Sequence, residues 1–185
     1  MFIINEGDIN ISDITNTAFY ATINGDSLYL TNSGNITIQN TNNHGIRNQI
    51  QNDSSYLEFT NTGNLIFKNI GQNEIWNESK TNNVGTEALA IFNNYGLIDI
   101  DNAQNSGIYN YANRAKLLFV NHQDAVVDID TTTQRGIFNY GRHDDFDDEI
   151  HLEVKNYGEI FVSHANQDAI YNLITNDSLK FDNFN

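Results

Sequence analysis

Two short acidic segments carry the residues best suited to acid–base or metal chemistry. Apolar and acidic residues alternate at positions 98–101 and again at 127–130. If both segments are strands, their acidic members Asp99, Asp101, Asp128 and Asp130 all point to the outer face. Neighbouring carboxylates serve as acid–base pairs or attract a cation such as calcium. Because no Lys or Arg occupies a matching position in these segments, we favour a solvated acidic stripe over a surface calcium site, and both over catalysis.

A second acidic cluster lies in an insertion that we place at residues 141–151. It is dense in the hard oxygen ligands that calcium prefers, although its spacing is not that of an EF-hand loop. His143 and His151 flank it at a spacing that specifies no particular metal. We expect a solvated charged loop that needs no cofactor, with calcium binding as the alternative. The acidic residues of the insertion are Asp144, Asp145, Asp147, Asp148 and Glu149.

The composition excludes several classes of protein. The 185 residues include 24 acidic and 9 basic side chains, and the net charge of −15 opposes binding to nucleic acids and anionic membranes. Without cysteine the chain forms no disulfide or thiolate metal site, and no apolar run reaches the ~18 residues of a membrane-spanning helix. The sequence contains no recognisable Ser–His–Asp arrangement and no phosphate-binding glycine loop. We therefore expect no enzymatic activity, no nucleic-acid partner and no membrane insertion.

The elements that position these residues follow from an internal repeat, which begins with an alternating segment. Its form is apolar-x-Asn-x-Gly-x-apolar-x-apolar, as alternation in a half-buried β-strand requires. Copies occur at 3–11, 30–38, 59–67, 92–100 and 154–162. A variant copy at 119–129 contains two extra residues, and we assign Gln123 to the position of the glycine.

A second landmark, Gly-Ile-x-Asn, follows the first at a constant distance. Clear copies begin at Gly45, Gly107 and Gly136, and looser copies begin at Ala18, Glu74 and Ala169. In five of the six copies this landmark begins 11 residues after the position of the first glycine. Apart from the variant copy, all variation in repeat length falls after the second landmark. Two strands of fixed spacing are therefore followed by a loop of variable length.

These features predict an all-β fold, a parallel β-helix (β-solenoid) of about six coils with a period of 27–35 residues, as one domain over residues 1–185. Coils would stack ~4.8 Å apart. Inward Asn side chains at two corners would each bond to the same residue of the next coil, a structural role. The first expected ladder is Asn5, Asn32, Asn61, Asn94, Asn121 and Asn156, and the second is Asn48, Asn77, Asn110, Asn139 and Asn172.

The variable residue of Gly-Ile-x-Asn points outward and is aromatic in four consecutive coils. The resulting stripe consists of Trp76, Tyr109, Phe138 and Tyr171, and is extended by Tyr111 and Tyr140. Exposed apolar ladders are typical of contact surfaces. Three interpretations remain open: the variable loops cover the rings, a protein partner packs on them, or the rings stack on the sugars of a glycan.

Both ends of the chain interrupt a coil. Residues 177–183 repeat the first strand of a coil, and Met1 enters another coil part-way. We expect a fragment of a longer solenoid, with further coils as its neighbours. The alternative is a subunit whose open ends stack on other copies to form a filament.

The repeats resemble those of secreted bacterial β-helical proteins, the autotransporter and filamentous-haemagglutinin type. Residues 30–36 and the segment from Gly107 to Asn110 carry the likeness most closely. The resemblance implies a right-handed β-helix displayed outside the cell or on the bacterial surface, as an adhesin or its stalk. We therefore expect a non-catalytic structural or adhesive module, with a filament subunit and a polysaccharide-binding or polysaccharide-cleaving β-helix as the alternatives.

Overall fold

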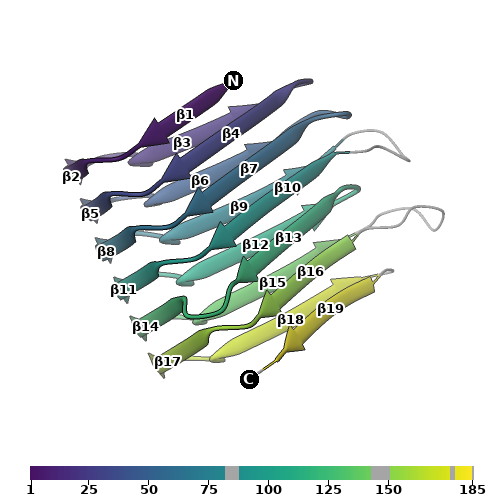
Figure 1. Ribbon diagram of the computed structural model, residues 1–185. Helices are drawn as coiled ribbons and strands as arrows, with labels where there is room; N and C mark the ends of the chain where they lie inside the picture. Colours follow the sequence, from purple (N-terminus) through teal and green to yellow (C-terminus); the bar gives the residue numbers. More distant parts are fainter. Residues whose placement is uncertain (82–87, 143–150, 176–177, 185) are drawn as a thin grey trace.

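A computed structural model describes residues 1–81, 88–142, 151–175 and 178–184, and within them it contains 19 strands and no helix (Figure 1). Every strand pairs in parallel with a strand of the neighbouring coil, at offsets between 27 and 35 residues. The strands form three sheets that run the length of the solenoid. The predicted parallel β-solenoid of about six coils is therefore confirmed.

Each coil contributes one strand to each sheet, and sheet A holds one strand more than the others. Sheet A consists of β1 (Phe2–Asn5), β4 (Ser27–Asn32), β7 (Tyr56–Asn61), β10 (Leu89–Asn94), β13 (Lys116–Asn121), β16 (His151–Asn156) and β19 (Ser178–Asn183). Sheet B consists of β2 (Asp8–Ile14), β5 (Asn35–Thr41), β8 (Asn64–Ile70), β11 (Leu97–Ala103), β14 (Val126–Thr132) and β17 (Glu159–Ala165). Sheet C consists of β3 (Phe19–Ile23), β6 (Ile46–Ile50), β9 (Ile75–Lys80), β12 (Ile108–Asn113), β15 (Ile137–Arg142) and β18 (Ile170–Thr175).

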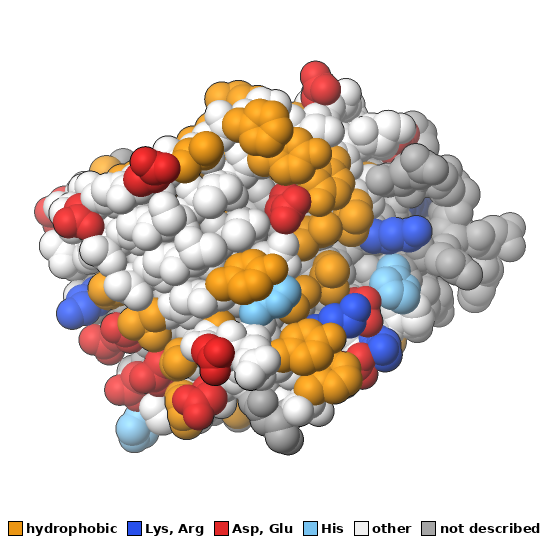
Figure 2. All heavy atoms as spheres, in the orientation of Figure 1, with side chains coloured by type: hydrophobic (Ala, Val, Ile, Leu, Met, Phe, Trp, Pro, Cys, Tyr) orange, Lys and Arg blue, Asp and Glu red, His pale blue; other side chains and the backbone are white. Residues whose placement is uncertain are grey.

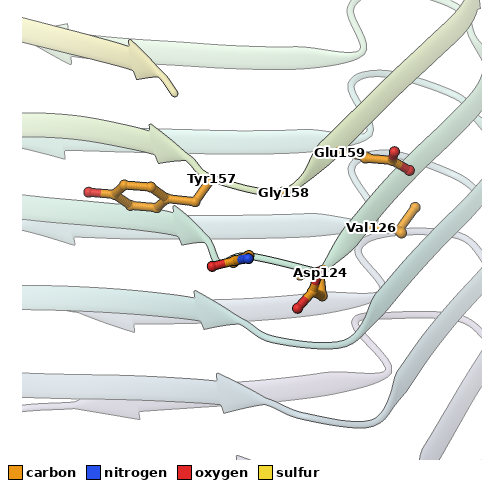
Figure 3. A pocket seen from close by; sticks show the side chains of 7 residues that line it. Asp124, Val126, Tyr157, Gly158 and Glu159 are labelled. Atoms are coloured by element: carbon orange, nitrogen blue, oxygen red, sulfur yellow. The ribbon is translucent and has the colours of Figure 1, made fainter. Parts of the chain in front are cut away.

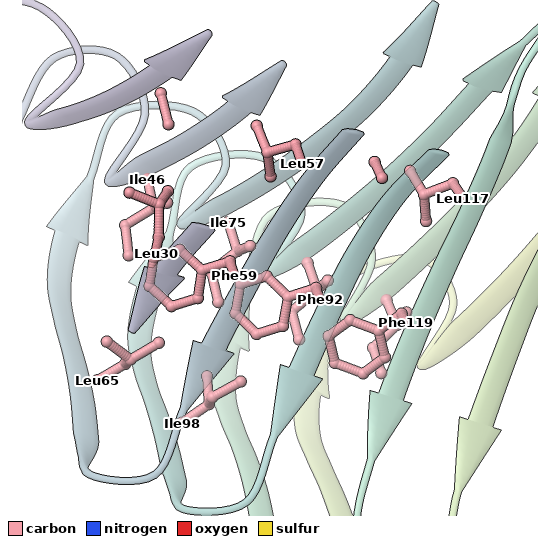
Figure 4. Close-up of a cluster of buried hydrophobic side chains, with 14 of the residues drawn as sticks. Leu30, Ile46, Leu57, Phe59, Leu65, Ile75, Phe92, Ile98, Leu117 and Phe119 are labelled. Atoms are coloured by element: carbon pink, nitrogen blue, oxygen red, sulfur yellow. The ribbon is translucent and has the colours of Figure 1, made fainter. Parts of the chain in front are cut away.

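A dry core fills the space between the sheets because alternate side chains of every strand point inward. Its centre is a column of phenylalanines from sheet A (Figure 4). The ring centroids of Phe59 and Phe92 lie 4.9 Å apart, and those of Phe92 and Phe119 lie 5.5 Å apart. Register between coils therefore places like side chains on one another, which is how a short repeat builds a continuous core.

A glycine at the turn between the strands of sheets A and B is required because the backbones of successive coils stack closely there. A Cβ on Gly34 would lie 2.0 Å from the carbonyl oxygen of Gly7, and one on Gly63 would lie 2.0 Å from that of Gly34. Neither glycine has a positive φ. The carbonyl of each accepts a hydrogen bond from the next coil, as in the 3.1 Å bond from the Asn64 amide to Gly34.

The variant coil departs from our assignment of its glycine position. Ala125, not Gln123, supplies the carbonyl that the glycine supplies elsewhere: it accepts the Glu159 amide at 2.9 Å. The segment from His122 to Asp124 instead bulges outward, with Asp124 at φ 65° and the Ala125 amide bonded to the His122 carbonyl at 3.1 Å. The two extra residues therefore precede the glycine position, and the strand resumes in register after them.

A left-handed residue recurs in every strand of sheet B, a feature that the repeat alone did not indicate. It bends each strand before its last residues, with φ values between 51° and 64°. Asn and Asp tolerate this conformation better than other non-glycine residues, and they occupy four of the six positions. The column is Asp13, Asn40, Asn69, Asn102, Thr131 and His164.

The acidic insertion is shorter than predicted. Gly141 and Arg142 belong to β15, and His151 begins β16. The interval between these strands, including His143 and the five acidic residues Asp144, Asp145, Asp147, Asp148 and Glu149, lies outside the described residues. Its calcium site therefore stays a prediction.

Candidate contact surfaces and charged clusters

The first asparagine ladder runs without a break through all seven strands of sheet A. In every step the side-chain Nδ2 donates to the Oδ1 of the next coil at 2.7–2.8 Å. The same Nδ2 also approaches a backbone carbonyl of its own turn, as Asn61 does to Gly63 at 3.1 Å. The ladder therefore supplies hydrogen bonds both between neighbouring coils and within each turn. It continues to Asn183, beyond the predicted members.

The second ladder links the five predicted residues of sheet C in the same direction. Its bonds measure 3.0 Å from Asn48 to Asn77 and 2.8–2.9 Å in the later steps. Ala21 occupies the position before Asn48, so the ladder begins one coil late. The Oδ1 of Asn48 is buried and has no hydrogen-bond partner among the described residues.

The predicted aromatic stripe is continuous on the outer face of sheet C, and its rings stack mainly on one another. Successive ring centroids from Trp76 to Tyr171 lie 5.0–5.5 Å apart. Tyr111 and Tyr140 form a second row, 5.4 Å apart. All six side chains are half-buried, because each ring covers part of its neighbours. The rings of this row are inclined to one another by 35–61°. Burial raises the pKa of the Tyr109 phenol.

Guanidinium groups lie over rings near both ends of the stripe. Arg47 lies over the rings of Tyr20 and Trp76, at 5.4 and 4.3 Å from their centroids. Arg135 lies 4.5 Å from the Phe138 centroid and 4.4 Å from that of Tyr171. Cation–π contacts of this kind are worth roughly 0.5–1 kcal/mol at exposed sites.

Buried Glu78 anchors Arg47 beside the stripe. Its Oε2 accepts hydrogen bonds from Arg47 at 2.9 Å and from Gln49 at 2.7 Å. The Tyr20 hydroxyl in turn donates to Gln49. This network fixes a charged pair at the surface of an otherwise apolar stripe.

The four aspartates of the sheet B stripe lie where alternation places them. Asp99 pairs in register with Asp128, and Asp101 pairs with Asp130. Partial burial raises the pKa of Asp99, and the neighbouring carboxylate of Asp128 raises it further. Lys68, one coil earlier, pairs in register with Asp101, so a cation lies closer to the stripe than the two segments alone indicated. Across the described ranges, no group of three His, Cys, Asp or Glu side chains converges on a cation position.

Asp130 contacts a serine and a histidine, a cluster that was not predicted from the sequence. Its Oδ1 accepts the Ser163 hydroxyl at 2.8 Å and lies 2.7 Å from Nδ1 of His164. The bond to His164, followed by that to Ser163, lowers the pKa of the Asp130 carboxyl. Because Ser163 donates to the aspartate rather than to the imidazole, the cluster lacks the Ser–His hydrogen bond that activates a nucleophile.

Two ionisable residues are buried, although neither was predicted as a site: His44 in the second coil and Glu74 in the third. Glu74 occupies the position of Gly45 and Gly107, is 0% exposed, and its carboxylate oxygens have no partner among the described residues. Burial raises the pKa of its carboxyl well above the usual value. Burial, with the charge of Arg47, lowers the pKa of His44 to about 4.

A second aromatic column lies along the edge between sheets A and B, and sequence reasoning missed it. Its members directly follow the first asparagine ladder: Tyr95, His122, Tyr157 and Phe184. Tyr95 stacks on His122 with centroids 3.7 Å apart, and Tyr157 stacks on Phe184 at 4.5 Å. A fixed offset of one residue after each ladder Asn could have identified it. Figure 2 shows hydrophobic side chains gathered over sheet A and acidic ones most frequent toward sheet B.

Comparisons with protein-family models, curated proteins and solved structures found no significant match. No helix capable of crossing a membrane occurs in the described part of the chain. Because a solenoid fold by itself specifies no activity, function must be argued from the surfaces described above.

Proposed function

We propose that the chain is a non-catalytic structural and adhesive module, displayed outside the cell, whose contact surface is the outer face of sheet C. The observation that carries this proposal is the continuous row of half-exposed rings over four coils, with a second tyrosine row beside it. Flat aromatic surfaces with a few fixed polar groups are enriched at protein contacts. The resemblance to secreted β-helical repeats supports the extracellular location.

The two asparagine ladders suit such a module, because they make the coil a stiff support. Each internal coil is held to the next by parallel backbone pairing in three sheets and by a buried amide bond at two corners. A rigid surface loses little conformational entropy when it binds, so a row of rings held on such a support can act as a preorganised contact.

The test compares binding of the wild-type chain with that of Tyr111→Ser/Tyr140→Ser. The immobilised protein would be probed with a panel of glycans and extracellular-matrix proteins. Ile66→Ser/Phe161→Ser is the matched control, because it removes a similar outward apolar area from sheet B. We expect at least one ligand whose binding falls about tenfold in the sheet C variant only. Equal loss in both variants, or no bound ligand in either panel, would overturn the proposal.

A further inference from the structure

The outward bulge of the variant coil splits the second aromatic column into two stacked pairs. Tyr95 covers the face of His122 toward the N-terminal coils, and Phe184 covers the face of Tyr157 toward the C-terminal end. The rings of His122 and Tyr157 line a common hollow beside the bulge. Among the described rings, these two alone in the column follow one another without stacking.

Two hollows open at this break and share Gln123 and Tyr157. One, of about 530 Å³, is lined by Gln123, Asp124, Tyr157 and Glu159, with the backbone of Gly158 at its floor (Figure 3). The other, of about 630 Å³, is lined by His122, Gln123, Tyr157 and Phe184. Volumes of this size accommodate small organic ligands.

The negative charge of the residues that line the two hollows favours the binding of a cation. Asp124 and Glu159 contribute two carboxylates, no Lys or Arg lines either hollow, and the chain as a whole carries a net charge of −15. Neither carboxylate makes a hydrogen bond or ion pair with another described residue. Burial lowers the pKa of His122, which keeps the imidazole neutral and its face attractive to positive charge.

We propose that this break in the column is a binding site for a small organic cation with a methylated ammonium group. The rings of His122, Tyr157 and Phe184 line one hollow, and the carboxylates of Asp124 and Glu159 line the adjoining one. Aromatic rings and carboxylates together attract a weakly hydrated ammonium more strongly than they attract a neutral molecule. The site is independent of the sheet C contact surface, since it lies at a different edge of the solenoid and uses none of its residues.

Choline is a suitable probe, and 3,3-dimethylbutan-1-ol is its neutral isostere. Each would be titrated into the full chain at constant ionic strength, with the ring resonances of His122 and Tyr157 followed by NMR. We expect saturable shifts with choline and affinity at least about tenfold weaker for the isostere. Equal affinity for both compounds, or no shifts with choline, would overturn the proposal.

Two double variants distinguish binding that depends on the local carboxylates from binding that depends only on the overall negative charge of the protein. Asp124→Asn/Glu159→Gln removes the two local charges and should weaken choline binding by about tenfold or more. Asp99→Asn/Asp101→Asn removes the same formal charge from sheet B and should leave the affinity within about twofold. An equal loss in both variants would mean that only the overall charge attracts the cation, and would refute a localised site. Backbone NMR spectra of both variants serve as the check on folding.

Discussion

Asn48 lies in register with Ala21 of the preceding coil, and its buried side-chain oxygen accepts no hydrogen bond from a described residue. Ala21→Asn would place an amide donor below that oxygen and extend the second ladder by one step. We expect a gain of about 1 kcal/mol in the free energy of unfolding, measured by urea denaturation. Ala21→Leu adds similar bulk without a donor, and an equal gain from it would show that burial rather than the amide bond is responsible.

Removal of an internal member of the first ladder should be costly. Asn94 accepts from Asn61 at 2.8 Å and donates to Asn121 at 2.8 Å and to Gly96 at 3.0 Å. Asn94→Ala leaves buried polar groups in both neighbouring coils without partners, so we expect a loss of about 3 kcal/mol. Asn93→Ala is the control, because the Asn93 side chain points outward and bonds to Glu58 at 3.1 Å. A loss below about 1 kcal/mol for Asn94→Ala would show that water replaces the ladder bond.

The glycine column predicts a difference between two chemically identical substitutions. A Cβ on Gly63 would lie 2.0 Å from the Gly34 carbonyl oxygen, whereas one on Gly7 would meet nothing within 4 Å. Gly63→Ala should therefore lower the free energy of unfolding by about 3 kcal/mol or more, because two coils must separate. Gly7→Ala should change it by less than about 0.5 kcal/mol. Similar thermal shifts for both variants in calorimetry would contradict the close-stacking explanation.

Sequence reasoning predicted the fold and both ladders because their cause is periodic. The constant spacing of 11 residues fixes which strands follow one another, and register then stacks Asn on Asn. The same reasoning placed Trp76 and Tyr109 correctly on an outer face. It could not predict that their rings would cover one another, since ring orientation depends on side-chain packing between coils.

The features that escaped prediction are those that break the repeat. Gln123 was assigned to the glycine position because a count of residues does not show where a bulge leaves the ladder; the carbonyl of Ala125 identifies the true position. Glu74 occupies a position that is glycine in other coils, and the sequence did not indicate that its carboxyl would be fully buried. Irregular positions of this kind are where a repeat protein differs from a uniform support, and the proposed cation site lies at one of them.

His44 predicts a loss of stability in acid. Its folded-state pKa of about 4 lies below the usual value of 6.5, so the folded chain binds fewer protons than the unfolded chain between these values. Stability should fall as the pH decreases from about 6.5 to 4, by up to about 3 kcal/mol. His44→Asn, which introduces the residue found at position 73 of the next coil, should remove this part of the pH dependence. If the free energies of unfolding of the wild type and of His44→Asn change equally with pH over that range, this prediction is wrong.

Glu74 predicts the opposite dependence at higher pH. Burial raises its folded-state pKa well above the usual value of 4.5, so the folded chain keeps a proton that the unfolded chain releases. No charged side chain is a cause of this shift. The contribution of Glu74 to stability should therefore fall steadily as the pH rises above about 4.5.

Two substitutions isolate this effect. Glu74→Gln keeps the volume of the side chain but cannot ionise, and Glu74→Gly restores the residue found in the second, fourth and fifth coils. Both should be more stable than the wild type at pH 8, by about 1–3 kcal/mol, and the advantage of Glu74→Gln should shrink as the pH approaches 5. Urea denaturation at pH 5, 6.5 and 8 measures the difference. A constant difference between Glu74→Gln and wild type at all three pH values would mean that Glu74 is ionised in the folded chain and is compensated there.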